Sequence, residues 1–600
     1  MVKIKIKRRG KIKFKKGISV VFRRKPIVIN YIPKKVSGEQ KIETAGGEKK
    51  IESGQAPQVI AQMLPKSLKL SVEEKKKKYR ILGIPFPKIK SKIKPIEKRF
   101  REEDLHSVDI KYPLIPKEPR KGEKIFAYAH IYWDSNNHEL RYDVVEPELT
   151  ESDVKLLEMI KDYIREKIDI DFAAIKKFEA KNYLFKKIDE ALEYFQIQLP
   201  ETLVEIFKYY VDRDFLGFGK IEPLLQDDNI EDISCDGVNI PIYIVHRDTR
   251  FGSIKTNIVF ESSEELDSFV MKLAQRCGKD ISMAHPLLDG ILPDNSRVQA
   301  TLATDIARKG SNFTIRKFSK EPFTPTMHIL YNTCDVKLMS YLWFAIENGR
   351  NILISGGTSS GKTSLLNSIS MFIKPQEKIV SIEDTGELQL PHPNWVPEVA
   401  REIIEEGRSS VTLFDLLRES LRQRPDRIIV GEVRGRETFV LFQAMATGHP
   451  GLATIHAESI ERLIDRLITP PINLPPSLLE TLDLIIFISR VKMGNKIVRR
   501  ITSIEEICGM DYKQKRPITN TFARWNPKKD EFNIVNTSVI LKKIVEITGI
   551  SRKEMEENII GKAKVLEWLA ERNIVDYRRF GKYLAQYNAD PKKFLEFIAK

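Results

Sequence analysis

A glycine-rich loop with a lysine near its end carries the strongest chemical signal in this 600-residue chain. Residues 356–363 read GGTSSGKT and match the phosphate-binding pattern G-x-x-x-x-G-K-[ST] at every position. Glycines let the backbone curl so that its N–H groups face phosphate oxygens, and the following helix adds its positive N-terminal end. A strand-like run before the loop and a helix-like run after it argue against a chance Gly/Ser turn. The residues expected to hold phosphate are Gly356, Gly357, Thr358, Ser359, Ser360, Gly361, Lys362, Thr363 and Ser364.

Two side chains of this loop have distinct expected roles. Lys362 should reach the β- and γ-phosphates of ATP, and the hydroxyl of Thr363 should ligate Mg²⁺. The sequence therefore predicts a Mg²⁺-dependent ATPase, which converts ATP and water to ADP and phosphate.

Two acidic segments follow apolar, strand-like runs further along the chain. Glu432 comes after Arg427–Gly431, where P-loop enzymes place a carboxylate beside the metal and the attacking water. Gly431 replaces the usual aspartate there, so Glu432 should bind the metal through water or orient the nucleophile. Residues 383–387 (EDTGE) add three acids at another strand end, and Glu387 is a second candidate for activating water. Taken alone, each segment also fits a solvated surface loop.

Histidines and arginines complete the set of candidates. His449 and His456 bracket a short apolar run, and next to Glu432 they would be able to sense the γ-phosphate by hydrogen bonding, although a lone histidine is usually structural. Arg297 and Arg316 precede the loop and would come from another domain. A guanidinium from there, or from a neighbouring subunit, would stabilise charge on the γ-phosphate as an arginine finger. Plain surface arginines are the alternative.

The elements that must position these residues are visible as short apolar runs. Helix-like segments separate most of them, which indicates a largely parallel α/β sheet. Upstream, strand-like runs and helical periodicity from about residue 125 predict an α+β domain, with Thr150 and Asp153 as a helix-capping pair. The apolar runs expected to form the parallel strands are Asn351–Ser355, Ile379–Glu383, Arg427–Gly431, Leu452–His456 and Leu484–Ser489.

Charge and composition describe the rest of the chain. The net charge is +17, and residues 1–38 hold fourteen Lys or Arg with no acid, which favours an anionic partner. Residues 83–98 combine three prolines with many lysines, so we expect extended, poorly ordered chain and a flexible arm over residues 1–110. None of the four cysteines forms a C-x-x-C pair, so no zinc is expected. No apolar run approaches the ~18 residues of a membrane span, and no secretory signal is recognisable, so a cytosolic location is expected.

The combination of motifs resembles the type II/type IV secretion ATPase superfamily, and within it the archaeal branch of archaellum motor and pilus-assembly ATPases. The segments that carry the likeness are similar, in the same order, to that family's Walker A, Asp box, Walker B and His box. Two upstream segments, LPDNSRVQ and FTIRKF, resemble parts of its N-terminal domain. The four core segments are GGTSSGKTSLLN (356–367), SIEDTGELQLPHPNW (381–395), LRQRPDRIIVGEVRGRE (421–437) and FQAMATGHPGLATIHAES (442–459).

The resemblance implies a fold, a site and an assembly. It implies catalytic roles for Glu432, Glu387, His449 and His456, and nucleotide contacts from Arg297 and Arg316. It also implies a RecA-like C-terminal domain, a mobile N-terminal domain, and a hexameric ring on the cytoplasmic membrane face. That ring would push on a polytopic membrane platform protein to assemble a pilus-like filament, an archaellum or a secretion machine. The implied divisions are an arm (1–110), an α+β N-terminal domain (111–322), the P-loop domain (323–510) and a mainly helical extension (511–600).

The sequence departs from the family in two places and leaves alternatives open. Gly386 stands where the archaeal Asp box usually has arginine, and the tetracysteine zinc insert of bacterial type II members is missing. The basic arm fits an anionic leaflet, at about 1 kcal/mol per Lys or Arg near the surface, but also a solvated tail. A nucleic-acid-translocating ATPase is the alternative function, although no basic groove interleaved with aromatics is visible. A nucleotide-gated scaffold without turnover is a third.

Overall fold

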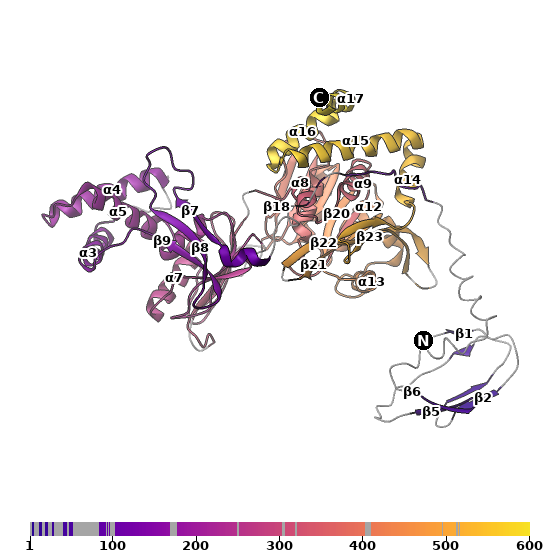
Figure 1. Ribbon diagram of the computed structural model, residues 1–600, viewed down its shortest axis with the longest axis horizontal. Coiled ribbons are helices and arrows are strands. Elements are labelled where there is room, and N and C mark those ends of the chain that lie inside the picture. The colour runs from indigo at the N-terminus through magenta and orange to yellow at the C-terminus, as the bar shows by residue number, and fades with distance from the viewer. Residues whose placement is uncertain are drawn as a thin grey trace. The chain divides into compact units, whose positions relative to one another are not determined.

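The computed structural model contains two large sheets, each with its own helices (Figure 1). The chain divides into two units, Met1–Ile81 and Leu82–Lys600. The structure describes the backbone of six short strands in the first unit. In the second unit it describes residues 83–599 apart from 92, 94, 96–101, 169–176, 249–250, 303–305, 319–320, 402–409, 495, 512–513 and 515. Within these described residues, no helix has the length and apolar character needed to span a bilayer.

The first unit contains three antiparallel strand pairs, β1 with β4, β2 with β3 and β5 with β6. Most of the arm expected to be flexible lies outside the described residues, so that expectation stays a prediction. The six strands are β1 Lys3–Ile4, β2 Lys11–Phe14, β3 Ile18–Val21, β4 Ile27–Val28, β5 Gln40–Thr44 and β6 Gly47–Ile51.

The N-terminal sheet of the second unit has nine strands in the order β13-β14-β15-β10-β11-β12-β9-β8-β7, and all pairs except β12–β9 are antiparallel. Its buried face packs with helix α7 (Ser263–Arg276) into one core. The predicted α+β character is confirmed. The strands are β7 Asp109–Ile115, β8 Ala127–Asp134, β9 Glu139–Val145, β10 Ile230–Cys235, β11 Tyr243–His246, β12 Ser253–Thr256, β13 Leu287–Ile291, β14 Arg297–Thr301 and β15 Asn312–Arg316.

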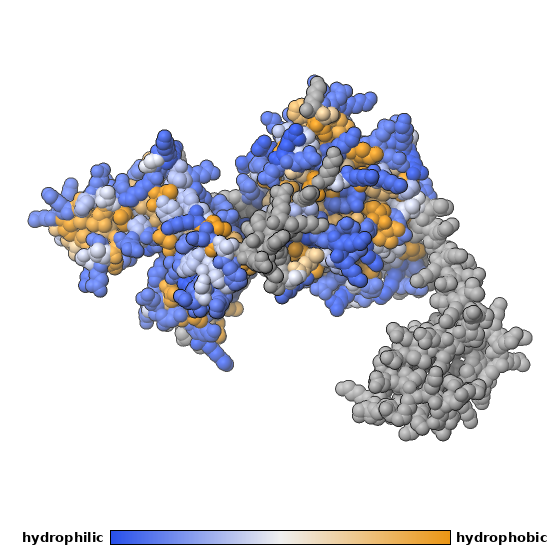
Figure 2. Space-filling view, in the orientation of Figure 1, coloured by the Kyte–Doolittle hydropathy of each residue, from blue (hydrophilic) through white to orange (hydrophobic). Residues whose placement is uncertain are grey.

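Three helices between β9 and β10 form a subdomain with a small core of their own. They are α3 (Glu151–Lys167), α4 (Lys177–Tyr194) and α5 (Glu201–Val211). The predicted cap of α3 is confirmed, because Thr150 and Asp153 form a reciprocal capping box. Figure 2 shows apolar residues gathered on these helices, and their exposed side chains include Phe178 and Tyr194.

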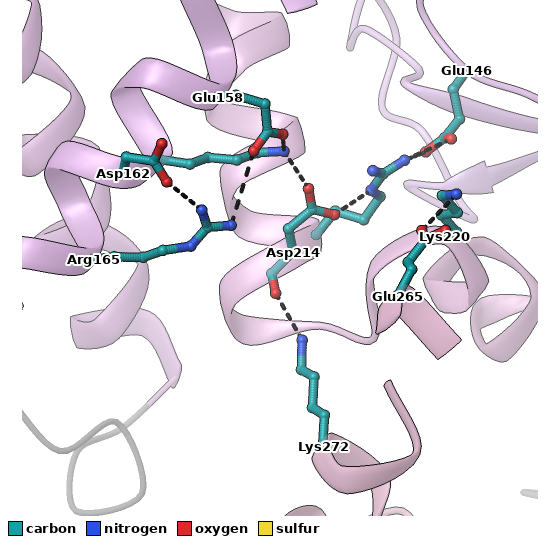
Figure 3. Close-up of polar contacts among 10 residues, drawn as sticks. Glu146, Glu158, Asp162, Arg165, Asp214, Lys220, Glu265 and Lys272 are labelled. Atoms are coloured by element: carbon teal, nitrogen blue, oxygen red, sulfur yellow. Dashed lines mark hydrogen bonds and ion pairs between the residues drawn. The ribbon is translucent and has the colours of Figure 1, made fainter. Parts of the chain in front are cut away.

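A polar network joins this subdomain to the sheet domain through Asp214 (Figure 3). Asp214 lies in the π-turn Asp212–Leu216 after α5, and its carboxylate contacts Lys161 Nζ at 2.7 Å and Arg213 Nε at 2.8 Å. Lys272 of α7 donates to the Asp214 carbonyl at 2.7 Å. Burial alone would raise the pKa of Asp214, but Arg213 and Lys161 hold it below its usual value. The ionised carboxylate therefore fixes the chain where helices give way to sheet.

The C-terminal sheet also has nine strands, in the order β18-β17-β19-β20-β16-β21-β22-β23-β24. The pairs from β18 to β21 are parallel, and the strands beyond β21 pair antiparallel. The predicted, mostly parallel sheet is confirmed, with the loop-bearing strand β16 buried at its centre. The strands are β16 Ile352–Ser355, β17 Ile379–Glu383, β18 Trp395–Val399, β19 Arg427–Val430, β20 Gly451–Ile455, β21 Leu484–Met493, β22 Lys496–Asp511, β23 Arg516–Asn526 and β24 Glu531–Ile534.

Helices cover both faces of this sheet, because its central strands are apolar on both sides. One core contains helices α8, α9, α10 and α14–α17, and the other contains α11, α12 and α13. The helices are α8 Pro325–Leu330, α9 Val336–Glu347, α10 Lys362–Ser370, α11 Leu413–Ser420, α12 Glu437–Ala446, α13 Ile460–Ile468, α14 Val539–Thr548, α15 Arg552–Glu571, α16 Tyr577–Ala589 and α17 Pro591–Ala599. A five-residue α6, Glu222–Gln226, lies in the N-terminal domain.

The C-terminal domain does not end at residue 510, where the implied division lies. Strands β23 and β24 continue its sheet, and only from Val539 onward is the chain mainly helical. Phe522 and Trp525 of β23 join the same core as the P-loop strand, as do buried residues of α14–α17. Polar residues are frequent in β23, so its sequence gives only a weak strand signal. Pairing with β22 is what stabilises this strand. The last 90 residues therefore complete the domain, instead of forming a separate extension.

The described part of residues 83–98 is extended, as expected, but it is bound to the C-terminal domain. Ile84 and Ser538 exchange two backbone hydrogen bonds of 2.8 Å. The ring of Phe86 meets Tyr341 and Phe522 edge-on, with centroids 6.1 and 5.7 Å away. The expectation of poor order was wrong for this stretch, because its few apolar residues find a core that no local pattern reveals.

We predict that Phe86→Ala will destabilise the C-terminal domain by roughly 1–3 kcal/mol, because the half-buried ring loses two aromatic contacts. Differential scanning calorimetry of the full-length protein should show a lower midpoint for that domain. Lys88→Ala, an exposed change in the same segment, is the matched control and should leave the midpoint in place. Equal midpoints for wild type and Phe86→Ala would contradict the packing described here.

Candidate functional site

The glycine-rich loop connects β16 to α10 at the carboxyl edge of the parallel strands, where α/β folds bind ligands. Its first residue passes so close to β21 that a Cβ at Gly356 would lie 2.1 Å from the carbonyl oxygen of Ile488. Its last glycine, Gly361, has φ +91° and directly precedes Lys362, the first residue of α10. Glycine is therefore required at both positions, for the close approach at Gly356 and for the left-handed backbone at Gly361.

Lys362 lies near charged side chains from the ends of β17 and β19 and from α13. Its Nζ donates to the carbonyl of Gly357 at 2.9 Å. Burial lowers the pKa of Lys362, and the nearby carboxylates of Glu432 and Glu387 oppose that change. The structure thus brings these two predicted carboxylates to the loop lysine, as expected for acids that act beside a γ-phosphate.

His456 holds the loop through both of its ring nitrogens. Nδ1 lies 3.0 Å from the carbonyl of Gly356, and Nε2 lies 2.9 Å from the hydroxyl of Thr358. A carbonyl only accepts, so Nδ1 must carry the proton and Nε2 must accept from Thr358. Burial, followed by the charge of Lys362, lowers the pKa of His456, which keeps this neutral tautomer. Arg466 of α13 donates to the His456 carbonyl at 2.7 Å and fixes its backbone.

Glu432 is held by an arginine that sequence reasoning missed. Arg434 Nη2 donates to Glu432 Oε2 at 2.7 Å, and Nη1 lies 3.9 Å from Asp384 Oδ2. Burial would raise the pKa of Glu432, but Arg434, then Lys362 and His456, hold it below its usual value. Glu432 is therefore ionised at neutral pH. The sequence alone could have predicted this ion pair, because Arg434 comes two residues after Glu432 at the end of a strand.

The second acidic segment contains two glutamates in different environments. Glu383 is buried and accepts N–H hydrogen bonds from Glu387 at 3.0 Å and Leu388 at 3.1 Å, while burial raises its pKa to about 8. It therefore shapes the segment that carries Glu387. Gly431 packs against the same side chain, because a Cβ there would lie 3.1 Å from Cγ of Glu383. At Gly386 a Cβ would lie 3.3 Å from Cγ2 of Val399.

The structure separates the other histidine from the loop. His449 precedes β20, whereas His456 follows it, so the two lie at opposite ends of a five-residue strand, on the order of 17 Å apart. His449 Nδ1 lies 3.1 Å from the carbonyl of Pro425, at the amino edge of the sheet. Within one subunit it therefore does not join the Lys362 cluster.

The two predicted arginines lie together on the N-terminal sheet. Arg297 of β14 and Arg316 of β15 are direct cross-strand partners, and both side chains are exposed. Arg297 lies 3.8 Å from a carboxylate oxygen of Asp289. One exposed sheet face thus presents two guanidinium groups, and their contact with nucleotide stays a prediction.

The described residues contain no group of three or more His, Cys, Asp or Glu able to hold a metal by themselves. Mg²⁺ does not need such a group, because it keeps several waters and binds one or two side chains beside substrate phosphates. Thr363, at the start of α10, and the ionised Glu432 provide the oxygen ligands that suit it.

Comparison with known proteins gives one family and several relatives. Residues 216–520 match the family described as type II/IV secretion system protein. An uncharacterized protein of the archaeon Methanocaldococcus jannaschii is 38% identical over 492 residues, which is 78% of this chain and 88% of that protein. A putative conjugal transfer protein of Mycobacterium tuberculosis is 33% identical over 255 residues, 41% of this chain and 70% of the relative.

Among solved structures, one similar chain is the VirB11 ATPase from the Brucella suis type IV secretion system, in complex with sulphate. It is 24% identical and covers 49% of this chain and 93% of its own length, with a TM-score of 0.24.

We predict that His456 titrates below the usual histidine value of about 6.5, and that two substitutions shift its pKa in opposite directions. Lys362→Gln removes a positive neighbour and should raise the pKa, whereas Glu432→Gln removes a negative one and should lower it. The stability that the neutral ring contributes is present above the unfolded pKa and is lost as the pH falls below it. NMR of ¹³C-labelled histidine rings, assigned with His456→Gln, measures these midpoints. Shifts of the same sign would contradict the arrangement.

Proposed function

The chain belongs to the type II/IV secretion system protein family, and we propose that it is an ATP-hydrolysing motor of that family. The observation that carries this proposal is the cluster at the phosphate loop. Lys362, Glu432, Glu387 and His456 come from four separate segments and meet beside one loop in which Gly356 and Gly361 cannot be replaced without collision or strain. A surface loop of chance composition would not gather such a set.

The proposed chemistry assigns each group a task. The loop N–H groups and the α10 N-terminus bind the phosphates, and Lys362 neutralises the γ-phosphate. Glu432, kept ionised by Arg434, orients the attacking water and accepts its proton as the water oxygen bonds to the γ-phosphorus, the bond from that phosphorus to the β,γ-bridging oxygen breaks, and ADP leaves. Glu387 supports the same water. His456 positions the loop through Gly356 and Thr358 and does not itself transfer a proton.

Mg²⁺ completes the proposed site. Thr363 would ligate it directly and Glu432 through water, and the bound ion would neutralise charge on the β- and γ-phosphates.

The proposal for domain motion begins with the positions of Arg297 and Arg316. Arg297 and Arg316 belong to a different sheet from the P-loop, and we propose that they reach the nucleotide as the N-terminal domain moves, in the same subunit or across a hexameric ring. Hydrolysis would then be coupled to domain motion. The ring would work on a polytopic membrane platform protein, driving assembly of a pilus-like filament, an archaellum or a secretion machine, with the basic arm on anionic lipid.

A second candidate is a nucleic-acid-translocating ATPase. Two observations favour it, namely the net charge of +17 and a relative named as a putative conjugal transfer protein. Both candidates use the same nucleotide site and differ in the polymer or membrane component that stimulates it.

We predict that Lys362→Ala abolishes ATP hydrolysis, because the γ-phosphate loses its cation. Glu432→Gln should bind ATP but hydrolyse it about 10²-fold or more slowly, because the amide cannot accept a proton. Phosphate release and binding of a fluorescent ATP analogue measure the two steps separately. Glu419→Gln, an exposed change on α11, is the matched control and should retain full activity. If Glu432→Gln turned over like wild type, Glu432 would not be the base, and if wild type itself did not turn over, a nucleotide-gated scaffold would be favoured.

We predict that acidic liposomes stimulate the ATPase and float with the protein, and that deleting residues 1–81 abolishes flotation while basal activity remains. The deletion removes one compact unit and spares the Ile84–Ser538 contact. Neutral phosphatidylcholine vesicles are the control for charge. Stimulation by single- or double-stranded DNA without any response to acidic lipid would favour the nucleic-acid translocase.

A further inference from the structure

Another cation approaches the phosphate loop from a strand that carries none of the recognised motifs. Arg499 lies on β22, and its Nε donates to the carbonyl of Ser359 at 3.2 Å. Its Cδ lies 3.1 Å from the place that a Cβ at Gly361 would occupy. The side chain therefore lies against the second half of the loop, which matches the need for glycine at residue 361.

The backbone under Arg499 is fixed by its neighbour. Arg500 is 1% exposed, and its guanidinium binds Asp530 with Nε at 2.8 Å and Nη2 at 3.1 Å. Its Nη1 donates to the carbonyls of Tyr331 and Arg499 at 3.0 and 2.9 Å. Burial would raise the pKa of Asp530, but Arg500 and Trp525 hold it below its usual value. A buried ion pair of this kind holds the backbone of β22 beneath Arg499, from which the Arg499 side chain reaches the loop.

The two arginines differ in their partners. Arg500 has a carboxylate, whereas Arg499 forms no ion pair with any carboxylate that the structure describes. An unpaired guanidinium with several free N–H donors, a few ångströms from amides that cradle phosphate, is suited to bind an oxyanion. Lys362 forms the same kind of contact within the loop, donating to the carbonyl of Gly357.

The strand order fixes on which side of the phosphate loop Arg499 lies. Glu432 and His456 follow β19 and β20, on one side of the loop-bearing strand β16, and β21 with β22 lies on the other side. Arg499 therefore lies away from the side where water would attack the γ-phosphate.

We propose that Arg499 is a nucleotide-binding residue, whose guanidinium binds the α- and β-phosphates of ATP and ADP from the β22 side of the loop. This inference rests on the proposed ATPase function and adds a residue to the same site. Because α- and β-phosphates are common to substrate and product, Arg499 contributes to affinity for both nucleotides and little to turnover. An arginine finger on the γ-phosphate would do the opposite.

The test compares Arg499→Ala, Arg499→Lys and Arg490→Ala in the full-length protein. Arg490 of β21 is the exposed cross-strand partner of Arg499 and serves as the control for loss of one surface charge. Calorimetric titration with ATP and ADP should give Kd values about 10- to 100-fold weaker for Arg499→Ala, to the same extent for both nucleotides. Arg499→Lys should keep part of the wild-type affinity. Arg490→Ala should keep all of it. In steady-state assays KM should rise while kcat changes less than about threefold.

Several results would overturn the inference. Unchanged Kd values for Arg499→Ala would do so, as would equal losses in Arg499→Ala and Arg490→Ala. A fall in kcat with normal affinity would assign Arg499 to the γ-phosphate instead. If Arg499→Ala unfolds, Arg499→Lys and Arg499→Gln provide the same comparison. Failure of the proposed function is distinguishable, because wild-type protein itself would then bind no nucleotide, or would bind it without turnover.

Discussion

The close passage of the phosphate loop between neighbouring strand ends is the constraint on which the rest of the site depends. Gly356 passes so close to the Ile488 carbonyl of β21 that no side chain fits there. On the other side, His456 contacts the loop with both ring nitrogens. Parallel strands end at the same edge of the sheet, so β19, β20 and β17 bring their polar residues to the same place. The loop, the acids and the histidine are therefore consequences of one sheet order.

The electrostatics of the site separate two kinds of carboxylate. Glu432 is stabilised as an anion by Arg434 and Lys362, whereas burial raises the pKa of Glu383 to about 8. The first is suited to bind water or metal at neutral pH, and the second to shape the chain around it. Gly431 connects the two, because it packs closely against the side chain of Glu383. A side chain at residue 431 would have to displace Glu383 by a few tenths of an ångström.

The C-terminal domain is larger than its motifs suggest. It begins with the segment near Ile84, which precedes the N-terminal domain in sequence, and it ends with α17. Glu506 of β22 joins α9, β23 and α14, since its buried carboxylate accepts from Tyr341 at 2.6 Å, from Asn520 at 2.9 Å and from the backbone of Val539 at 2.7 Å. Segments far apart in the chain are therefore held by one polar group inside an apolar core.

The sequence by itself determined the local features of this protein. The phosphate loop, the parallel strands, the Thr150 cap and the strand-end acids follow from residue type and spacing over a few positions. Only the tertiary structure decided which distant residues meet. It separated His449 from His456 and brought Phe86 to Phe522 and Arg499 to Ser359. The reason is physical, because strand order and core packing bring together residues that no local periodicity connects.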